Sequence, residues 1–66
     1  MLLKVNGKEE TLEKELTILE YITEKNLNPE RLVVEHNREI ILKENLGDIK
    51  LKENDELEIL SFVSGG

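Results

Sequence analysis

Apolar and polar residues alternate at the start of the chain, and this pattern predicts a β-hairpin over residues 1–13. Leu3 and Val5 fall on one face of the first strand, and Asn6-Gly7 supplies the two positive-φ positions that a type I′ turn requires. The second strand, predicted over 8–13, is almost entirely polar, as is typical of a strand at the edge of a sheet.

Residues 18–26 have the pattern of an amphipathic helix with a complete start signal. Thr17 and Glu20 have the spacing of a capping box, in which each side chain accepts a hydrogen bond from the backbone amide of the other residue. Pro29 cannot continue a helix, so the helix must end before it. The apolar face of this helix is formed by Ile18, Tyr21 and Ile22.

Three further strands are predicted in the second half of the chain, at 32–36, 39–42 and 56–62. Asn37-Arg38 forms the turn between the first two, although its left-handed geometry costs a non-glycine residue such as arginine about 1 kcal/mol. The intervening segment 43–54 is polar with isolated apolar anchors, and we expect turns at Gly47-Asp48 and over 52–56.

The order of these elements predicts an α+β fold, in which one helix packs across a mixed sheet of four to five strands. The first and last strands have the clearest apolar patterns, so we expect them to be neighbours at the centre of the sheet. Their pairing would be parallel, because a crossover containing the helix separates them. This is the β-grasp topology.

The last strand carries apolar residues on both of its faces. Leu57 and Ile59 point one way and are predicted to be core, while Leu60 and Phe62 point the other way. We expect Leu60 and Phe62 to form a small exposed apolar patch, which is typical of a partner-binding site. The alternative is that the segment 43–52 covers this face.

The acidic composition and the lack of long apolar runs exclude several classes of binding partner. The 66 residues include 15 acidic and 9 basic side chains, for a formal net charge of -6. Nucleic-acid binding depends on Lys and Arg contacts with phosphates, and without a basic cluster we expect no nucleic-acid partner. No apolar run approaches the about 20 residues that span a bilayer, and the N-terminus lacks a signal-peptide pattern, so we expect no membrane partner and a cytoplasmic location. An acidic surface suits a partner with a basic docking face.

Few side chains in this sequence are suited to catalysis. Cysteine is absent, His36 is the single histidine, and Ser61 and Ser64 have no evident base beside them. The carboxylates are explained most simply as a solvated face, because an acid–base pair needs a cleft that separates two pKa values. We therefore expect no enzyme, no metal site and no intrinsically bound cofactor, and we interpret His36 as an ordinary strand or turn residue.

Two glycines, Gly65-Gly66, follow the predicted last strand almost directly. We expect a domain over 1–63 and a tail over 64–66 that is disordered, because Gly and Ser bury nothing that offsets chain entropy. Residues without a β-carbon would let the tail enter a narrow channel, where condensation with a nucleotide phosphate would convert the Gly66 carboxylate into a reactive mixed anhydride. A frayed terminus or a cloning remnant is the alternative explanation.

Three segments carry a family resemblance: the opening 5–8 (VNGK), the stretch 34–41 (VEHNREII), and the ending 54–66, in which D-E-x-E-I-x-x-F-V-x-G-G is a specific pattern. On these residues the sequence resembles the ThiS family, the ubiquitin-like β-grasp sulfur carriers of thiamine thiazole biosynthesis. It departs from the family at Ser64, where Gly or Ala is frequent, and at Asn37-Arg38, where Asn-Gly is frequent. Neither departure touches the reacting group.

The resemblance implies a sulfur carrier rather than a catalyst. An E1-like enzyme using ATP and Mg²⁺ would adenylate the carboxylate of Gly66, and sulfur from a cysteine desulfurase relay would then replace AMP. The resulting thiocarboxylate would donate sulfur to thiazole synthase. The tail would comprise Ser64, Gly65 and Gly66, and partners would contact the root of the tail through an apolar centre with an acidic rim, predicted as Asp55, Glu56, Glu58, Leu60, Phe62 and Val63.

Two alternatives remain open at this point. A related β-grasp sulfur carrier would serve tRNA thiolation or molybdopterin synthesis, although the molybdopterin carrier is usually longer. A non-carrier interaction domain would have the same fold with incidental glycines. Intact mass after co-expression with an E1-like enzyme separates these classes, because only a carrier exchanges one oxygen atom for sulfur.

Overall fold

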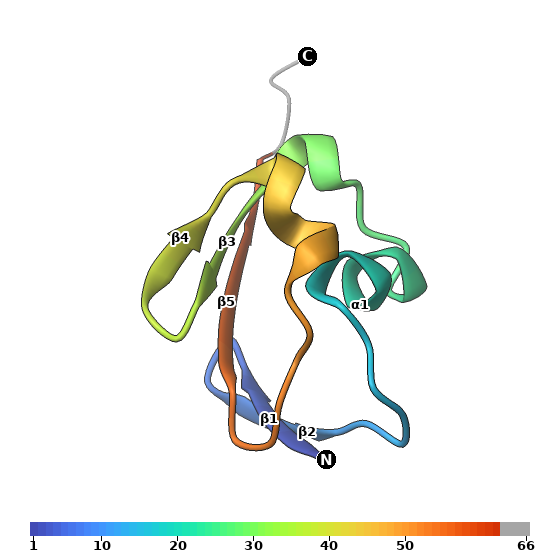
Figure 1. Cartoon of the computed structure of the whole chain (residues 1–66). Coiled ribbons are helices and arrows are strands. Elements are labelled where there is room, and N and C mark those ends of the chain that lie inside the picture. The colour runs from blue at the N-terminus through green and yellow to red at the C-terminus, as the bar shows by residue number, and fades with distance from the viewer. Residues whose placement is uncertain (63–66) are drawn as a thin grey trace.

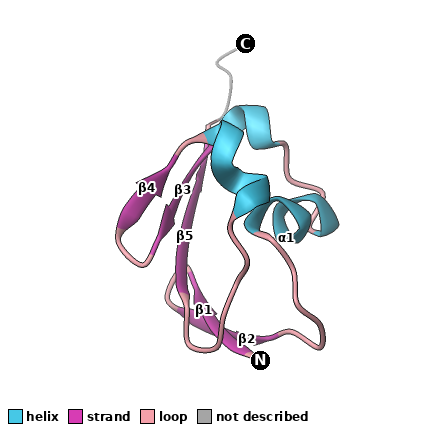
Figure 2. Ribbon diagram, viewed as in Figure 1, coloured by secondary structure: helices cyan, strands magenta, loops and turns pink. Residues whose placement is uncertain are grey.

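The computed structural model describes residues 1–62, which form a five-stranded sheet crossed on one face by a helix (Figures 1 and 2). The sheet order is β2-β1-β5-β3-β4, with β1 parallel to β5 and every other neighbouring pair antiparallel. The α+β class and the parallel pairing of the first and last strands are therefore confirmed. Along the chain the elements are β1 (Leu2–Val5), β2 (Lys8–Thr11), α1 (Ile18–Glu24), the 3₁₀ helix η1 (Pro29–Arg31), β3 (Leu32–His36), β4 (Glu39–Ile41), the 3₁₀ helix η2 (Lys43–Asp48) and β5 (Glu56–Ser61).

Capping chemistry determines where α1 begins and ends. The Thr17 hydroxyl oxygen accepts a hydrogen bond from the Glu20 amide at 3.1 Å, and Glu20 Oε1 accepts one from the Thr17 amide at 2.8 Å. The predicted capping box is therefore present. The helix ends at Glu24, two residues earlier than predicted, and Asn26 shortly after it has a φ of 61°, a left-handed conformation that is common just beyond helix ends.

Both predicted hairpin turns have left-handed residues. In the first, Asn6 has a φ of 50° and Gly7 a φ of 81°, and in the second, Asn37 has a φ of 51° and Arg38 a φ of 71°. Arg38 therefore occupies the conformation that glycine adopts at no steric cost. The second strand of each hairpin is shorter than predicted, because β2 ends at Thr11 and β4 at Ile41.

The core lies between the sheet and α1. Leu57 is 1% exposed, and Ile59 is half-buried and packs against the same cluster, so the predicted inward face of the last strand is confirmed. Among residues 1–62, the nine buried members of the core are Leu3, Leu16, Ile18, Tyr21, Ile22, Val34, Leu46, Leu51 and Leu57.

A polar contact at the margin of this core connects α1 to the edge strand β2. The Tyr21 hydroxyl donates a hydrogen bond of 2.7 Å to Glu10 Oε2, and Lys25 Nζ lies 2.7 Å from Glu10 Oε1. Burial first, and then the Glu10 carboxylate, raise the pKa of the Tyr21 hydroxyl well above its usual value. The hydrogen bond from Lys25 holds the pKa of Glu10 below its usual value against the effect of burial.

The segment after β4 differs from the sequence prediction. Gly47-Asp48 does not form an isolated turn but ends the 3₁₀ helix η2, which packs against α1. A β-carbon added at Gly47 would lie 3.4 Å from Leu19 Cδ2, so the glycine accommodates this close approach. Because the segment packs on the helix side of the sheet, it leaves the opposite face uncovered. The proposed boundary between residues 63 and 64 and the expected disorder of 64–66 lie outside the described residues.

Candidate functional site on the outer face of the last strand

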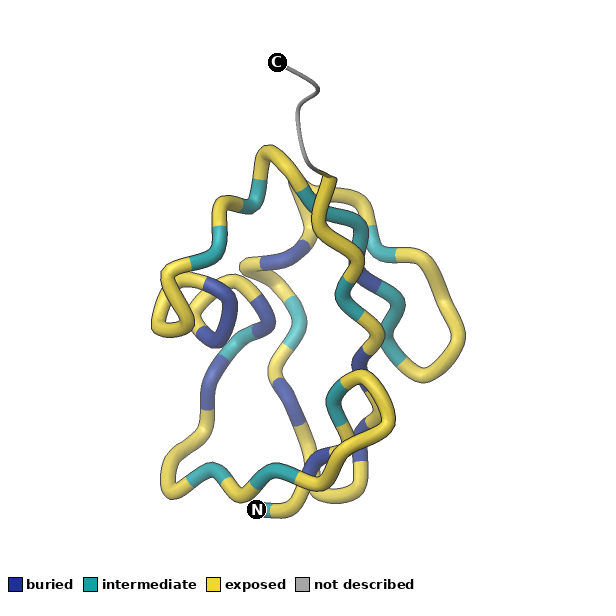
Figure 3. The backbone as a smooth tube through the Cα atoms, turned by 180° about the vertical axis from the view of Figure 1, so that it is seen from behind, coloured by how far each residue is buried: buried dark blue, intermediate teal, exposed yellow. Residues whose placement is uncertain are grey.

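The face of β5 that points away from α1 carries the predicted partner site. Leu60 is 65% exposed and Phe62 is 54% exposed, so the apolar patch of these two residues is present and the alternative of a covering segment is wrong. In the view from behind, the exposed colour extends over this last part of β5 until the grey trace begins (Figure 3). Glu56 and Glu58 are exposed on the same strand.

The neighbouring strand β3 extends this surface. In the antiparallel register Val33 lies opposite Leu60, and Glu35 lies opposite Glu58. Residues directly opposite one another in such a pair share a face, so an apolar zone lies near the end of β5 and an acidic zone lies next to it. None of the ion pairs within residues 1–62 involves Glu35, Glu56 or Glu58. The acidic zone therefore has no internal cation partner within the described chain.

Asp55 is the exception among the predicted rim residues. Only 7% of the residue is exposed, so the expectation that it lies on the exposed acidic rim is wrong. Asp55 lies two positions before Leu57 and four before Ile59, and side chains an even number of positions apart in an extended chain point to the same face. Asp55 therefore points inward, while Glu56 and Glu58 point outward.

The buried Asp55 carboxylate organises a polar cluster that the sequence analysis did not predict. Its Oδ2 accepts a hydrogen bond from the Lys52 amide at 2.9 Å and lies 2.7 Å from His36 Nε2, and its Oδ1 accepts one from Asn37 Nδ2 at 3.1 Å. An ionised carboxylate only accepts hydrogen bonds, so in this contact the His36 Nε2 is the donor. Burial alone would raise the pKa of Asp55, but the hydrogen bonds from His36, Asn37 and Lys52 outweigh it and hold this pKa below its usual value.

Asn37 completes the connection between the β3–β4 turn and the start of β5. Its Oδ1 accepts a hydrogen bond from the Glu56 amide at 2.9 Å, and its own amide donates one of 2.9 Å to the Glu56 carbonyl oxygen. The left-handed conformation of Asn37 thus places both its backbone and its side chain against β5. His36 lies at the end of β3 as expected, but it stabilises this connection through Asp55 rather than being an ordinary strand residue.

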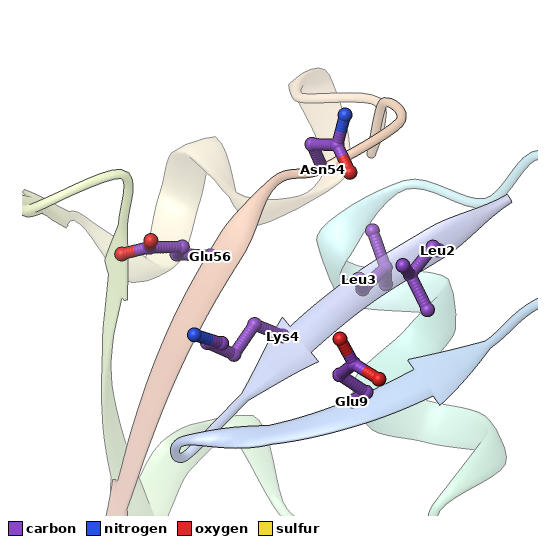
Figure 4. A pocket seen from close by; sticks show the side chains of 6 residues that line it. All are labelled: Leu2, Leu3, Lys4, Glu9, Asn54 and Glu56. Atoms are coloured by element: carbon purple, nitrogen blue, oxygen red, sulfur yellow. The ribbon is translucent and has the colours of Figure 1, made fainter.

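A hollow lies at the other end of the same face, where β5 begins. Figure 4 shows Lys4 of β1 between Glu9 of β2 and Glu56 of β5, and the register pairs Lys4 with both carboxylate residues. No ion pair within residues 1–62 joins these three side chains, and the hollow lies at the opposite end of β5 from Leu60 and Phe62. It contributes to the sheet rather than to the predicted site.

Val63, Ser64, Gly65 and Gly66 lie outside the described residues, so their predicted roles remain predictions. Within residues 1–62, no three His, Cys, Asp or Glu side chains are grouped so that they could hold a metal ion. In the same part of the chain no helix is long and apolar enough to cross a membrane.

Comparison with known proteins agrees with this geometry. The model of the ThiS family matches residues 3–66. The chain belongs to the ThiS family. It is 36% identical to the sulfur carrier protein ThiS of Bacillus subtilis, in an alignment that covers 98% of this chain and 100% of that protein. The crystal structure of the thiamine biosynthesis protein ThiS from Geobacter metallireducens superposes with a TM-score of 0.85 at 32% identity and full coverage of both chains, which confirms the β-grasp fold.

The ThiS-family sequence also matches part of a larger protein. Thiazole synthase of Paramagnetospirillum magneticum is 30% identical over the whole of this chain, and the chain spans 20% of the length of that relative.

Proposed function

We propose that this ThiS-family chain is a sulfur carrier and not a catalyst, and that the carboxylate of Gly66 is the group that carries sulfur. The observation on which the proposal depends is that the family match extends through both glycines to residue 66. With no cysteine in the chain, no thiol of its own could hold sulfur as a persulfide. The bond to sulfur would therefore be made at a carboxylate.

Activation would take place on an E1-like partner. In the first step the Gly66 carboxylate attacks the α-phosphate of ATP, pyrophosphate leaves, and an acyl-adenylate forms. In the second, sulfur at the oxidation level of sulfide attacks the acyl carbon and AMP leaves, which gives the thiocarboxylate. When the donor is a persulfide supplied by a cysteine desulfurase relay, a thiol provides the two electrons that release the sulfur. ATP and Mg²⁺ belong to the partner, and the carrier supplies only its own carboxylate.

The outer face of β5 would be the surface that the activating enzyme binds. The exposed side chains of Leu60 and Phe62 stand at the root of the tail, where a partner must hold the carrier to direct Gly66. Glu56 and Glu58 have no ion-pair partner among residues 1–62, so basic groups on the enzyme would complement them. A second copy of this chain would instead bring like charges together, because the chain has a net charge of -6.

Thiazole synthase would be the acceptor of the sulfur. Two relatives named thiazole synthase match this chain over 20% of their length, and a carrier-like segment within such a protein is what a direct functional connection would produce. The proposal therefore favours thiamine thiazole synthesis in the cytoplasm over tRNA thiolation or molybdopterin synthesis.

Intact mass spectrometry tests the proposal. The chain is incubated with an E1-like adenylating enzyme, ATP, Mg²⁺ and a persulfide donor, and the expected product has one oxygen replaced by sulfur. Addition of thiazole synthase and its small substrates should then return the carrier to its original mass. No mass change under any combination would contradict a carrier role. Conversion without consumption by thiazole synthase would contradict only the thiazole pathway.

A further inference from the structure

Alternate residues of β5 direct their backbone N–H and C=O groups to opposite neighbouring strands. The hydrogen bonds at the two ends of β5 show which residues face β3. Phe62 donates its amide to the Arg31 carbonyl oxygen at 2.7 Å, and at the other end Glu56 accepts a hydrogen bond from the Asn37 amide at 2.9 Å. In antiparallel strands, pairs that exchange backbone bonds alternate with pairs that do not. The even-numbered residues of β5 therefore direct their backbone groups to β3.

The odd-numbered residues of β5 consequently direct their backbone groups to the opposite side, towards β1. Asn6 occupies that side from Leu57 to Ile59. Its amide donates to the Leu57 carbonyl oxygen at 2.8 Å, its Oδ1 accepts from the Ile59 amide at 2.7 Å, and its Nδ2 donates to the Ile59 carbonyl oxygen at 3.3 Å. The left-handed turn at Asn6 leads the chain away into β2, so the Asn6 side chain replaces the last strand residue that β1 could have provided.

Ser61 is the next residue whose backbone groups face this edge. On the β3 side Ser61 lies opposite Leu32. The two residues form a non-hydrogen-bonded pair, which exchanges no backbone hydrogen bonds. Within residues 1–62, no group bonds to the Ser61 amide or carbonyl on the β1 side. The edge is also accessible, because Ser61 is exposed.

We propose that this free edge of β5, at Ser61, accepts an extended segment of a partner protein by strand addition. The Ser61 amide would donate to, and its carbonyl would accept from, the added backbone. The side chains beside the edge indicate the chemistry of that segment: an apolar residue would lie next to Leu60, and a basic residue would lie near Glu58. The inference rests on the proposed function, because the partner is the activating enzyme that must hold the chain in one direction as it leaves β5.

Replacement of Ser61 by proline tests the inference. Proline has no amide hydrogen, and in a sheet it is tolerated where the N–H faces an open edge, so Ser61→Pro should fold. Its affinity for a purified E1-like adenylating enzyme should fall about 3- to 10-fold, the effect of one lost backbone hydrogen bond. Ser61→Ala keeps the amide and serves as the matched control with unchanged affinity. Phe62→Pro removes an amide that bonds to the Arg31 carbonyl oxygen, directly before β3, and should damage the fold.

Amide hydrogen exchange on the unchanged protein gives a second measurement that does not depend on whether the proline variant folds. The Ser61 amide should exchange fast in the free chain and at least tenfold more slowly in the complex, while the Leu60 amide is slow in both. Equal affinities for Ser61→Pro and the wild type, or a Ser61 amide that stays fast in the complex, would overturn the inference. So would a Ser61 amide already slow in the free chain. Sulfur gain by the wild type separates this inference from the proposed function. If strand addition is contradicted but the wild type still gains sulfur, only the inference is wrong. If the wild type gains no sulfur, the proposed carrier function is wrong as well.

Discussion

His36 and Asp55, 19 positions apart in the sequence, meet through a contact of 2.7 Å between Nε2 and Oδ2. The contact joins the end of β3 to the residue that precedes β5, and Asn37 reinforces it from the adjoining turn. The strand that carries the predicted partner surface is therefore held at its beginning by a buried polar cluster.

Removal of the Asp55 carboxylate should destabilise the fold. Asp55→Ala leaves the His36 ring, the Asn37 amide group and the Lys52 backbone amide without their acceptor, and each unsatisfied buried group costs about 1–3 kcal/mol. We expect at least one such loss in the free energy of unfolding from urea titration at pH 7. Asp48→Ala, at an exposed aspartate of η2, is the control and should change stability by less than about 0.5 kcal/mol. Equal urea midpoints for the two variants would contradict the cluster's role.

The same carboxylate predicts a dependence of stability on pH. The pKa of Asp55 is lower in the folded chain than the ordinary value of 3.8, so the unfolded chain binds the proton more tightly. The contribution of this group is therefore complete above about pH 5, decreases as the pH falls through the ordinary value, and is lost below the folded pKa. Urea midpoints measured between neutral and strongly acidic pH should converge for the wild type and Asp55→Asn as the pH falls. A constant difference would show that Asp55 does not titrate in this way.

Tyr21 should resist ionisation, and its absorbance reports this directly because it is the only tyrosine. Burial and the Glu10 carboxylate both raise the pKa of its hydroxyl above 10. An alkaline titration of the folded chain should therefore show little phenolate at pH 10, where a free tyrosine is half ionised. Glu10→Gln should lower the transition towards the ordinary value, whereas Glu9→Gln on the same strand should not. A normal transition in the wild type would contradict the contact.

Leu57 and Leu60 allow a matched test of the two faces of β5. Leu57 is 1% exposed and Leu60 is 65% exposed. Leu57→Ala should lower the free energy of unfolding by about 2–5 kcal/mol, since it leaves a cavity in a packed core. The chemically identical change Leu60→Ala should cost less than about 0.5 kcal/mol. Similar losses for the two variants would show that the outer face is covered.

Negative charge on the apolar patch should prevent docking of the activating enzyme. The double variant Leu60→Asp with Phe62→Asp places charges where the partner's apolar contacts would form, yet both side chains are largely exposed, so the melting temperature should remain within a few degrees. Thr11→Asp with Asn45→Asp adds the same charge at exposed positions elsewhere and should bind normally. Binding of the wild type should weaken as salt is raised. Retained binding by the patch variant would exclude this face as the docking surface.

The position of the terminal carboxylate should decide whether sulfur is gained. Deletion of Gly66, or addition of one residue after it, moves the reacting group by one residue, about 3.3–3.6 Å, and should abolish thiocarboxylate formation while the melting temperature is unchanged. Gly65→Val should slow the reaction, because its β-branched side chain would clash with the walls of the partner's channel. Gly65→Ala adds a single methyl group and should slow the reaction less. Sulfur gain at the normal rate by the deletion variant would contradict the proposed site.

Most of the architecture follows from local chemistry in the sequence. Asn6-Gly7, the Thr17–Glu20 capping box and the alternation in 56–62 act between residues close in the chain, so each predicts its element without knowledge of the rest. The exposure of Leu60 and Phe62 was also predictable, because a strand with apolar residues on both faces can bury only one of them against a single helix. The chemistry proposed for Gly66 depends on the family to which the sequence belongs and not on any tertiary contact.

Only the tertiary structure decided what happens where distant segments meet. Asp55 is buried because the β3–β4 turn brings His36 and Asn37 to it, and a pattern of acidic residues does not show which one will find such donors. The free edge at Ser61 arises because the turn at Asn6 ends β1 before β5 ends, a difference in length between two strands at opposite ends of the sequence. Both features depend on the register of the sheet, and register is determined by the packing of the whole core rather than by any local pattern.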